Sequence, residues 1–168
     1  MKTYTVAVRA LCEFAAKRGD LDLRFTPSPT SQQGISGHQT VAASRSASYR
    51  SEVSLSGEYR HLVVRGRADG YDPDRQLLEE VKTFKGDLDL MPENHRHLHW
   101  AQAKVYGALM CRQFDLTGLT VSLVFFDIGR QHATAKNTSR ARILFALLPL
   151  STQEACRVGG RLKVHYVV

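Results

Sequence analysis

Residues 62–83 read LVVRGRADGYDPDRQLLEEVKT, and this stretch decides the fold that we expect. Apolar residues within 61–68 and 76–83 predict two short strands. The segment 70–74, GYDPD, predicts a turn between them, because Gly, Asp and Pro favour tight turns. Residues 49–59 alternate polar and apolar side chains and predict a preceding strand. Together the three strands indicate a β-meander.

Helical patterns flank this meander on both sides. Apolar spacing predicts helices over residues 4–18 and 95–112, and a shorter helix over 38–46 with His38 in its first turn. The Pro-, Ser- and Gly-rich residues up to Gly37 predict a loop. An apolar run over 119–128 predicts a buried strand. We therefore expect an α/β fold with a mixed β-sheet of about four strands flanked by helices.

The composition suits one domain and a polyanionic partner. The chain has 168 residues, of which 43% are hydrophobic, and a net charge of +7. Residues 51–100 hold 10 acidic and 7 basic residues, whereas basic residues are in excess on both sides of them. An acidic centre between basic arms suits a cation-binding site beside a phosphate-binding surface, although scattered surface charge explains the same composition.

Several classes of protein are disfavoured. No apolar run approaches the roughly 20 residues of a membrane-spanning helix, and charge interrupts the N-terminal segment where a signal peptide would be apolar. We therefore expect a cytoplasmic protein without a membrane partner. Cys12, Cys111 and Cys156 lack the C-x-x-C spacing of metal sites, so no iron–sulfur cluster is expected. The chain has no Walker motif and hence no motor of its own.

Two carboxylates and a lysine can share one surface of the predicted sheet. Asp69 lies at the end of one predicted strand, and Glu80 and Lys82 lie near the end of the next. Because strand side chains alternate, Glu80 and Lys82 face the same side, and Glu79 faces the other. Carboxylate oxygens are preferred ligands of Mg²⁺, and a lysine can act on an attacking water. The alternative is an ordinary Glu–Lys ion pair on a solvated strand.

Four short motifs follow one another in the chain: Gly37-His38, GRADGYD at residues 66–72, LEEVKT at 78–83 and QAKVY at 102–106. Together they resemble the motifs of the PD-(D/E)XK nuclease superfamily. The Gln-x-x-x-Tyr signature of the last motif is typical of its RecB-like branch. The resemblance implies a restriction-endonuclease-like core.

The same resemblance implies a metal centre and a catalytic group. The metal, Mg²⁺ or Mn²⁺, would be bound by His38, Asp69, Glu80 and the main-chain carbonyl of Val81. The catalytic residues would be Asp69, Glu80 and Lys82, with Lys82 acting on the attacking water. The alternative to a metal-ligand role for His38 is a histidine that caps its helix or is partly buried.

Three further residues are expected at the DNA. The resemblance implies that Gln102 and Tyr106, one helical turn apart, bind the DNA strand or hold Lys82 in place. Arg67 is the third expected DNA-binding residue. Core packing is the alternative for Tyr106, whereas a buried glutamine without a polar partner would be costly.

The order VRGRADG at 64–70, Glu80-x-Lys82-Thr83, and His99-x-x-Gln102-x-x-x-Tyr106 also resembles the N-terminal nuclease module of bacterial DinG/Rad3-like DNA helicases. This implies metal-dependent hydrolysis of phosphodiester bonds in DNA, preferably single strands or ends. The setting would be repair or recombination, coupled to a helicase. Two alternatives stay open: a catalytically weak DNA-binding or docking module with this fold, and a restriction or mobile-element endonuclease.

Two parts of the sequence depart from that pattern. His95 and His99 lie one helical turn apart and would allow a second metal, but a basic first helical turn is the preferred interpretation. After residue 130, the pattern lacks the polar strand and amphipathic helix expected to close the domain. We therefore expect a nuclease domain over residues 1–130 and an atypical tail over 131–168, for which a shifted reading frame or a truncated gene is one hypothesis.

Overall fold

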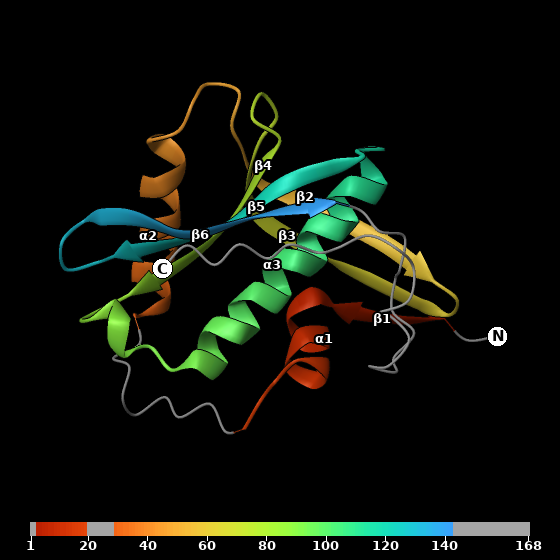
Figure 1. Cartoon of the computed structure of the whole chain (residues 1–168), viewed down its shortest axis with the longest axis horizontal. Helices are drawn as coiled ribbons and strands as arrows, with labels where there is room; N and C mark the ends of the chain where they lie inside the picture. Colours follow the sequence, from red (N-terminus) through yellow and green to blue (C-terminus); the bar gives the residue numbers. More distant parts are fainter. Residues whose placement is uncertain (1–2, 20–28, 143–168) are drawn as a thin grey trace.

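The computed structural model describes residues 3–19 and 29–142 (Figure 1). Its helices and strands follow one another in the order β1 (Tyr4–Ala7), α1 (Val8–Ala15), α2 (Ser31–Ala43), β2 (Arg50–Tyr59), β3 (Leu62–Asp72), β4 (Leu77–Phe84), the 3-10 helix η2 (Leu88–Leu90), α3 (Glu93–Gln113), β5 (Gly118–Asp127) and β6 (His132–Arg142). No helix within these two ranges is both long and apolar enough to cross a membrane.

A mixed sheet runs through the molecule in the order β1-β3-β4-β5-β6, and β2 also pairs with β3. β2, β3 and β4 are antiparallel neighbours, as expected of the predicted meander. β1 is parallel to β3, β4 is parallel to β5, and β6 is antiparallel to β5. α3 forms the crossover between the parallel strands β4 and β5. The predicted α/β class is confirmed and is consistent with a restriction-endonuclease-like core, but the sheet has six strands in the described part of the chain rather than about four.

Helices cover both faces of the sheet and bury two apolar clusters. α1 and α3 contact each other, and the cluster on their face of the sheet includes Met110 and Leu123. α2 packs against β4 and β5, where Val41 clusters with Val81 and Val124. Figure 1 shows α1 beside α3, with α2 apart from both. Leu123 and Val124 belong to different clusters because successive strand residues face opposite sides.

α2 begins at Ser31 rather than at residue 38, so the prediction of a loop up to Gly37 is wrong for that segment. The helix begins with a capping box. The Thr30 side chain accepts a hydrogen bond from the Gln33 backbone N–H, and the Gln33 side chain accepts one from the Thr30 N–H. His38 therefore lies in the middle of α2 and not in its first turn.

Two strands differ from the sequence-based expectation. Tyr4–Ala7 were expected to begin a helix, but they pair in parallel with β3, and α1 begins at Val8. Pairing with a neighbouring strand overrides local helical periodicity. His132–Arg142 form β6 against β5, where the pattern indicated an atypical tail. The rest of that expected tail, residues 143–168, lies outside the described residues.

Gly37 allows α2 to approach the sheet closely. A Cβ atom at this position would lie 2.5 Å from Thr83 Cγ2 and 2.9 Å from Phe126 Cδ1. At Gly34, by contrast, a Cβ atom would make an ordinary contact of 3.7 Å with Thr83 Oγ1. The close approach at Gly37 brings the next residue, His38, within reach of the end of β3.

We expect the two glycines to respond differently to alanine. Gly37→Ala should lower the free energy of unfolding by about 1–3 kcal/mol, because the added methyl group overlaps Thr83 and Phe126. Gly34→Ala should leave it unchanged or raise it by up to about 1 kcal/mol, because alanine is the better helix former. Urea denaturation measures both values. Equal stability of the two variants would contradict the close packing of α2.

Candidate active site

A break in the pairing of β3 marks the centre of the candidate site. β2 pairs with one edge of β3 along most of its length. The other edge pairs with β1 at residues 62–65 and with β4 only at residues 70–72. Among the described residues, 66–69 have no partner strand on that edge, because β4 continues alongside β5 instead. We call this opening the β3–β4 fork.

Asp69 spans the β3–β4 fork with both carboxylate oxygens. Its Oδ2 accepts a 2.7 Å hydrogen bond from the Val81 backbone N–H, and its Oδ1 lies 3.3 Å from Nδ1 of His38 on α2. The hydrogen bond to Asp69 raises the pKa of His38, although partial burial acts against it. Because the N–H and C=O of one strand residue point to the same edge, the Val81 carbonyl also faces the fork.

Glu80, Lys82 and Gln102 form a largely buried polar group on the α3 side of the fork. Lys82 Nζ donates a 2.7 Å hydrogen bond to Glu80 Oε1 and a 2.9 Å hydrogen bond to Gln102 Oε1. Glu80 is only 3% exposed, and its Oε2 has no hydrogen-bond partner in the described part of the chain. Burial raises the pKa of Glu80 to about 7, and the nearby charge of Lys82 opposes this shift.

Glu79 points to the opposite face of β4, as strand alternation predicts. Arg45, just after α2, donates two hydrogen bonds to it, from Nε to Oε2 at 2.8 Å and from Nη2 to Oε1 at 3.1 Å. The Tyr49 hydroxyl donates a third hydrogen bond, 3.0 Å long, to Oε2. These bonds direct Glu79 away from Glu80 and anchor the end of α2 to the sheet.

Tyr106 lies one turn after Gln102 on α3 and packs on β3. A Cβ atom at Gly66 would lie 2.9 Å from the Tyr106 ring, so the strand has room for this ring because residue 66 is glycine. Burial, together with the negative charges of Glu80 and Asp69, raises the pKa of Tyr106 to about 12. Tyr106 therefore closes the side of the fork nearest β1.

Arg67 differs from the other predicted site residues. Its side chain is exposed and lies 2.9 Å from Glu52. The structure thus leaves the Arg67 side chain on an open surface. Around the β3–β4 fork it gathers the remaining predicted residues, which are His38, Asp69, Glu80, Val81, Lys82, Gln102 and Tyr106.

The side-chain and backbone atoms at the fork are of the chemical types that bind a hard divalent cation. Two carboxylates, an imidazole and a backbone carbonyl are available, and a cation would satisfy the buried, unpartnered Oε2 of Glu80. Within residues 3–19 and 29–142, no group of three or more His, Cys, Asp or Glu side chains is close enough together to hold a metal ion. A bound cation would therefore have to draw the carboxylates of Asp69 and Glu80 together. His95 and His99, considered above as ligands of a second metal, also belong to no such group among the described residues.

The charge of Lys82 also acts on His99 and Cys12, to which the sequence analysis gave no role beside Lys82. The His99 ring lies 6.1 Å from the Phe125 ring, and burial, with nearby Lys82, lowers the pKa of His99 to about 3. Burial raises the pKa of the Cys12 thiol to about 11, and the charge of Glu80 adds to this shift. His99 is the first residue of the His99-x-x-Gln102-x-x-x-Tyr106 pattern quoted above, one helical turn before Gln102. Nothing in the sequence pattern indicates Cys12.

Comparisons with known proteins show similarity at the level of fold. No family model and no curated protein matches the sequence. The crystal structure of SSO0001 is similar over 82% of this chain and 69% of that chain, with a TM-score of 0.51 and 19% identity. A phage-related exonuclease from Haemophilus somnus 129PT aligns over 71% of this chain and 54% of its own, with a TM-score of 0.36 and 19% identity. The first likeness concerns the fold alone, and the second is too weak to support an argument.

Acid should destabilise the protein through His99. Because the folded-state pKa of about 3 lies below the ordinary value of 6.5, the unfolded chain binds more protons between these two values. The contribution of neutral His99 to stability is therefore complete above pH 6.5 and is lost as the pH falls toward 3. His99→Phe should make the acid-induced loss of unfolding free energy smaller by about 1 kcal/mol per pH unit, measured by urea denaturation.

The matched control is His61→Phe, which replaces an exposed histidine. The acid-induced loss of unfolding free energy should be smaller in His99→Phe than in this variant. An acid-induced loss that is identical in His99→Phe and wild type would contradict the burial of a neutral imidazole at position 99.

Proposed function

We propose that this chain is a metal-dependent DNA nuclease that hydrolyses phosphodiester bonds. The observation that carries the proposal is the meeting of Asp69, Glu80 and Lys82 at the β3–β4 fork, where Glu80 keeps a buried oxygen without a partner. Such an oxygen costs folding free energy, and a carboxyl with a strongly shifted pKa is a candidate functional group. The mixed α/β fold is compatible with this function without specifying it.

Mg²⁺ or Mn²⁺ would be held by His38, Asp69, Glu80 and the main-chain carbonyl of Val81. The bound cation would polarise the scissile phosphate and lower the pKa of a water molecule. Asp69 orders this side of the fork, because one oxygen lies beside His38 and the other accepts from Val81. One carboxylate oxygen of Glu80 accepts a hydrogen bond from Lys82. The other oxygen has no partner among the described residues and would be available to the cation.

Lys82 would act on the attacking water. Glu80 and Gln102 each accept one hydrogen bond from Nζ. An ammonium group has three donors, so one donor is left to orient the water or to stabilise negative charge on the phosphate in the transition state. Gln102 is in this respect a positioning residue, because it fixes Lys82. Gln102 and Tyr106 would meet the DNA strand from the α3 side of the fork.

The finer assignment rests on the sequence motifs. The Gln102-x-x-x-Tyr106 pattern supports the RecB-like branch of the PD-(D/E)XK superfamily. The order of the motifs supports a nuclease module that works with a DinG/Rad3-like helicase in repair or recombination, in the cytoplasm and without an iron–sulfur cluster. Single-stranded DNA or DNA ends would be the preferred substrates. A catalytically weak DNA-binding or docking module is the alternative that the following experiments separate.

Lys82→Ala and Asp69→Ala should each lower Mn²⁺-dependent cleavage of end-labelled single-stranded DNA by about 100-fold or more, because Lys82 would act on the attacking water and Asp69 would hold the cation. Binding of the same DNA in EDTA should be largely retained in both variants. Lys104→Ala removes the same charge from an exposed position on α3 and serves as the control. Unchanged cleavage in both site variants would reject the assignment. Binding without metal-dependent cleavage by the wild-type protein would favour the docking module.

Metal binding should also be visible without DNA. At a Mn²⁺ concentration about 100 times the dissociation constant, the free energy of unfolding should rise by about 2.7 kcal/mol. The increase should grow as the pH rises through about 7, because Glu80 must lose its proton to bind a cation. Glu80→Gln should abolish the increase, while Glu58→Gln at an exposed position should retain it. Thermal or urea denaturation with and without Mn²⁺ measures the effect, and equal stabilisation of both variants would place the cation elsewhere.

A further inference from the structure

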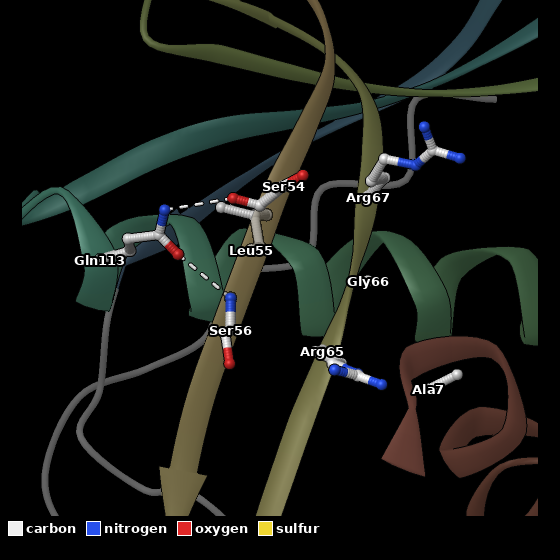
Figure 2. Close-up of a pocket in the computed structure, with 8 residues that line it drawn as sticks. All are labelled: Ala7, Ser54, Leu55, Ser56, Arg65, Gly66, Arg67 and Gln113. Atoms are coloured by element: carbon white, nitrogen blue, oxygen red, sulfur yellow. Dashed lines mark hydrogen bonds between the residues drawn. The ribbon is translucent and has the colours of Figure 1, made fainter. Parts of the chain in front are cut away.

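We infer that an open face of β2 and β3 binds the phosphodiester backbone of a single nucleic-acid strand and leads it to the β3–β4 fork. This face carries a groove of about 610 Å³ lined by Ala7, three successive residues of β2, three of β3, and Gln113 of α3 (Figure 2). The inference rests on the nuclease function proposed above. It adds a substrate path that includes Arg65, Ser54 and Ser56, none of which lies in the catalytic group.

The two strands supply hydrogen-bond donors to the same face of the sheet. Ser54 is the register partner of Arg67, and Ser56 is the partner of Arg65. Directly opposed residues of antiparallel strands project to the same side, so two hydroxyl groups and two guanidinium groups share one surface. Guanidinium groups bind phosphate oxygens in a bidentate manner, and hydroxyl groups can add further hydrogen bonds. The described residues that line the groove include no carboxylate.

The backbone beneath these side chains is held from the outer edge of β2. Gln113 Nε2 donates a 3.2 Å hydrogen bond to the Ser54 carbonyl, and Gln113 Oε1 accepts a 3.1 Å hydrogen bond from the Ser56 N–H (Figure 2). α3 therefore satisfies an edge that would otherwise be open to another strand. This contact stabilises the wall of the groove while using no side-chain atom of either serine.

The arginines of this groove are available to an anion. The Arg65 side chain makes no hydrogen bond or ion pair with the residues that the structure describes, and Figure 2 shows its guanidinium group on the side of Ala7. The Arg67 side chain is paired with Glu52, but the two side chains are 65% and 70% exposed. Exposed ion pairs of this kind are weak, so a polyanion can replace Glu52 as the partner of Arg67.

The groove leads along β3 toward the fork. Arg65, Arg67 and Asp69 follow one another in two-residue steps, which correspond to about 7 Å each along a strand. One row of cations suits one backbone rather than the two backbones of a duplex. The groove is lined by no aromatic residue among those described, so base stacking is not expected there and binding should depend little on base sequence.

Arg65→Gln tests the groove, with Arg130→Gln as the matched control. Both substitutions remove one exposed positive charge, but Arg130 follows β5 and is not among the groove residues. Binding of fluorescein-labelled oligo(dT) is measured by anisotropy in EDTA at a series of salt concentrations. In Arg65→Gln, the plot of log binding constant against log salt should become shallower by about 0.7, the value for one lost phosphate contact on a single strand. Arg130→Gln should retain the wild-type slope.

The two proposals can fail separately. Equal slopes for Arg65→Gln and Arg130→Gln would overturn the groove, even if both proteins cleave DNA in Mn²⁺. The same holds if the folded wild-type protein does not bind the oligonucleotide. The salt dependence of binding could become shallower in Arg65→Gln but not in Arg130→Gln, while the wild-type protein does not cleave DNA. This result would support the proposed binding groove and overturn the proposed nuclease activity. Circular dichroism confirms that each variant is folded.

Discussion

The hydrogen bond from the Val81 amide to Asp69 Oδ2 lies where backbone pairing between β3 and β4 has ended. A buried backbone N–H without a partner costs free energy, so the side chain of Asp69 compensates for the separation of the two strands. The separation allows α2 to reach the β3–β4 fork from one face of the sheet and α3 from the other. His38 meets Asp69 on the first side, and Gln102 meets Lys82 on the second. The candidate site therefore depends on the Asp69 side chain, which takes the place of a strand partner for the Val81 amide.

The adjacent glutamates Glu79 and Glu80 of β4 differ in their hydrogen-bond partners. Both oxygens of Glu79 accept hydrogen bonds, and its partners fasten α2 to the sheet. Glu80 is equally buried, yet one of its oxygens has no partner among the described residues, and its pKa is raised to about 7. Burying a charged pair such as Glu80 and Lys82 is seldom more stabilising than burying apolar residues of similar size. A fold selected for stability alone would not require Glu80, and this contrast supports a functional role for it.

Local patterns predicted much of the fold but not its edges. The meander, the long helix α3 and the buried strand β5 could each be predicted from a pattern that lies within the segment itself: alternation, helical spacing and an unbroken apolar run, respectively. β1 and β6 exist because they pair with β3 and β5, and four residues such as Tyr4–Ala7 contain too little pattern to reveal a distant partner. The start of α2 at Ser31 was missed because a capping box, rather than apolar spacing, begins that helix.

The sequence by itself determined the α/β class, the alternation that sends Glu79 and Glu80 to opposite faces, and the helical spacing that puts Gln102 and Tyr106 on one face. These properties follow from the periods of strands and helices, which act over a few residues. Only the tertiary structure decided that β3 and β4 separate at Asp69, that Glu80 keeps an unpartnered oxygen, and that Arg65 lines an open groove. Burial, strand pairing and the partners of polar atoms depend on segments far apart in the chain, so no local pattern contains them.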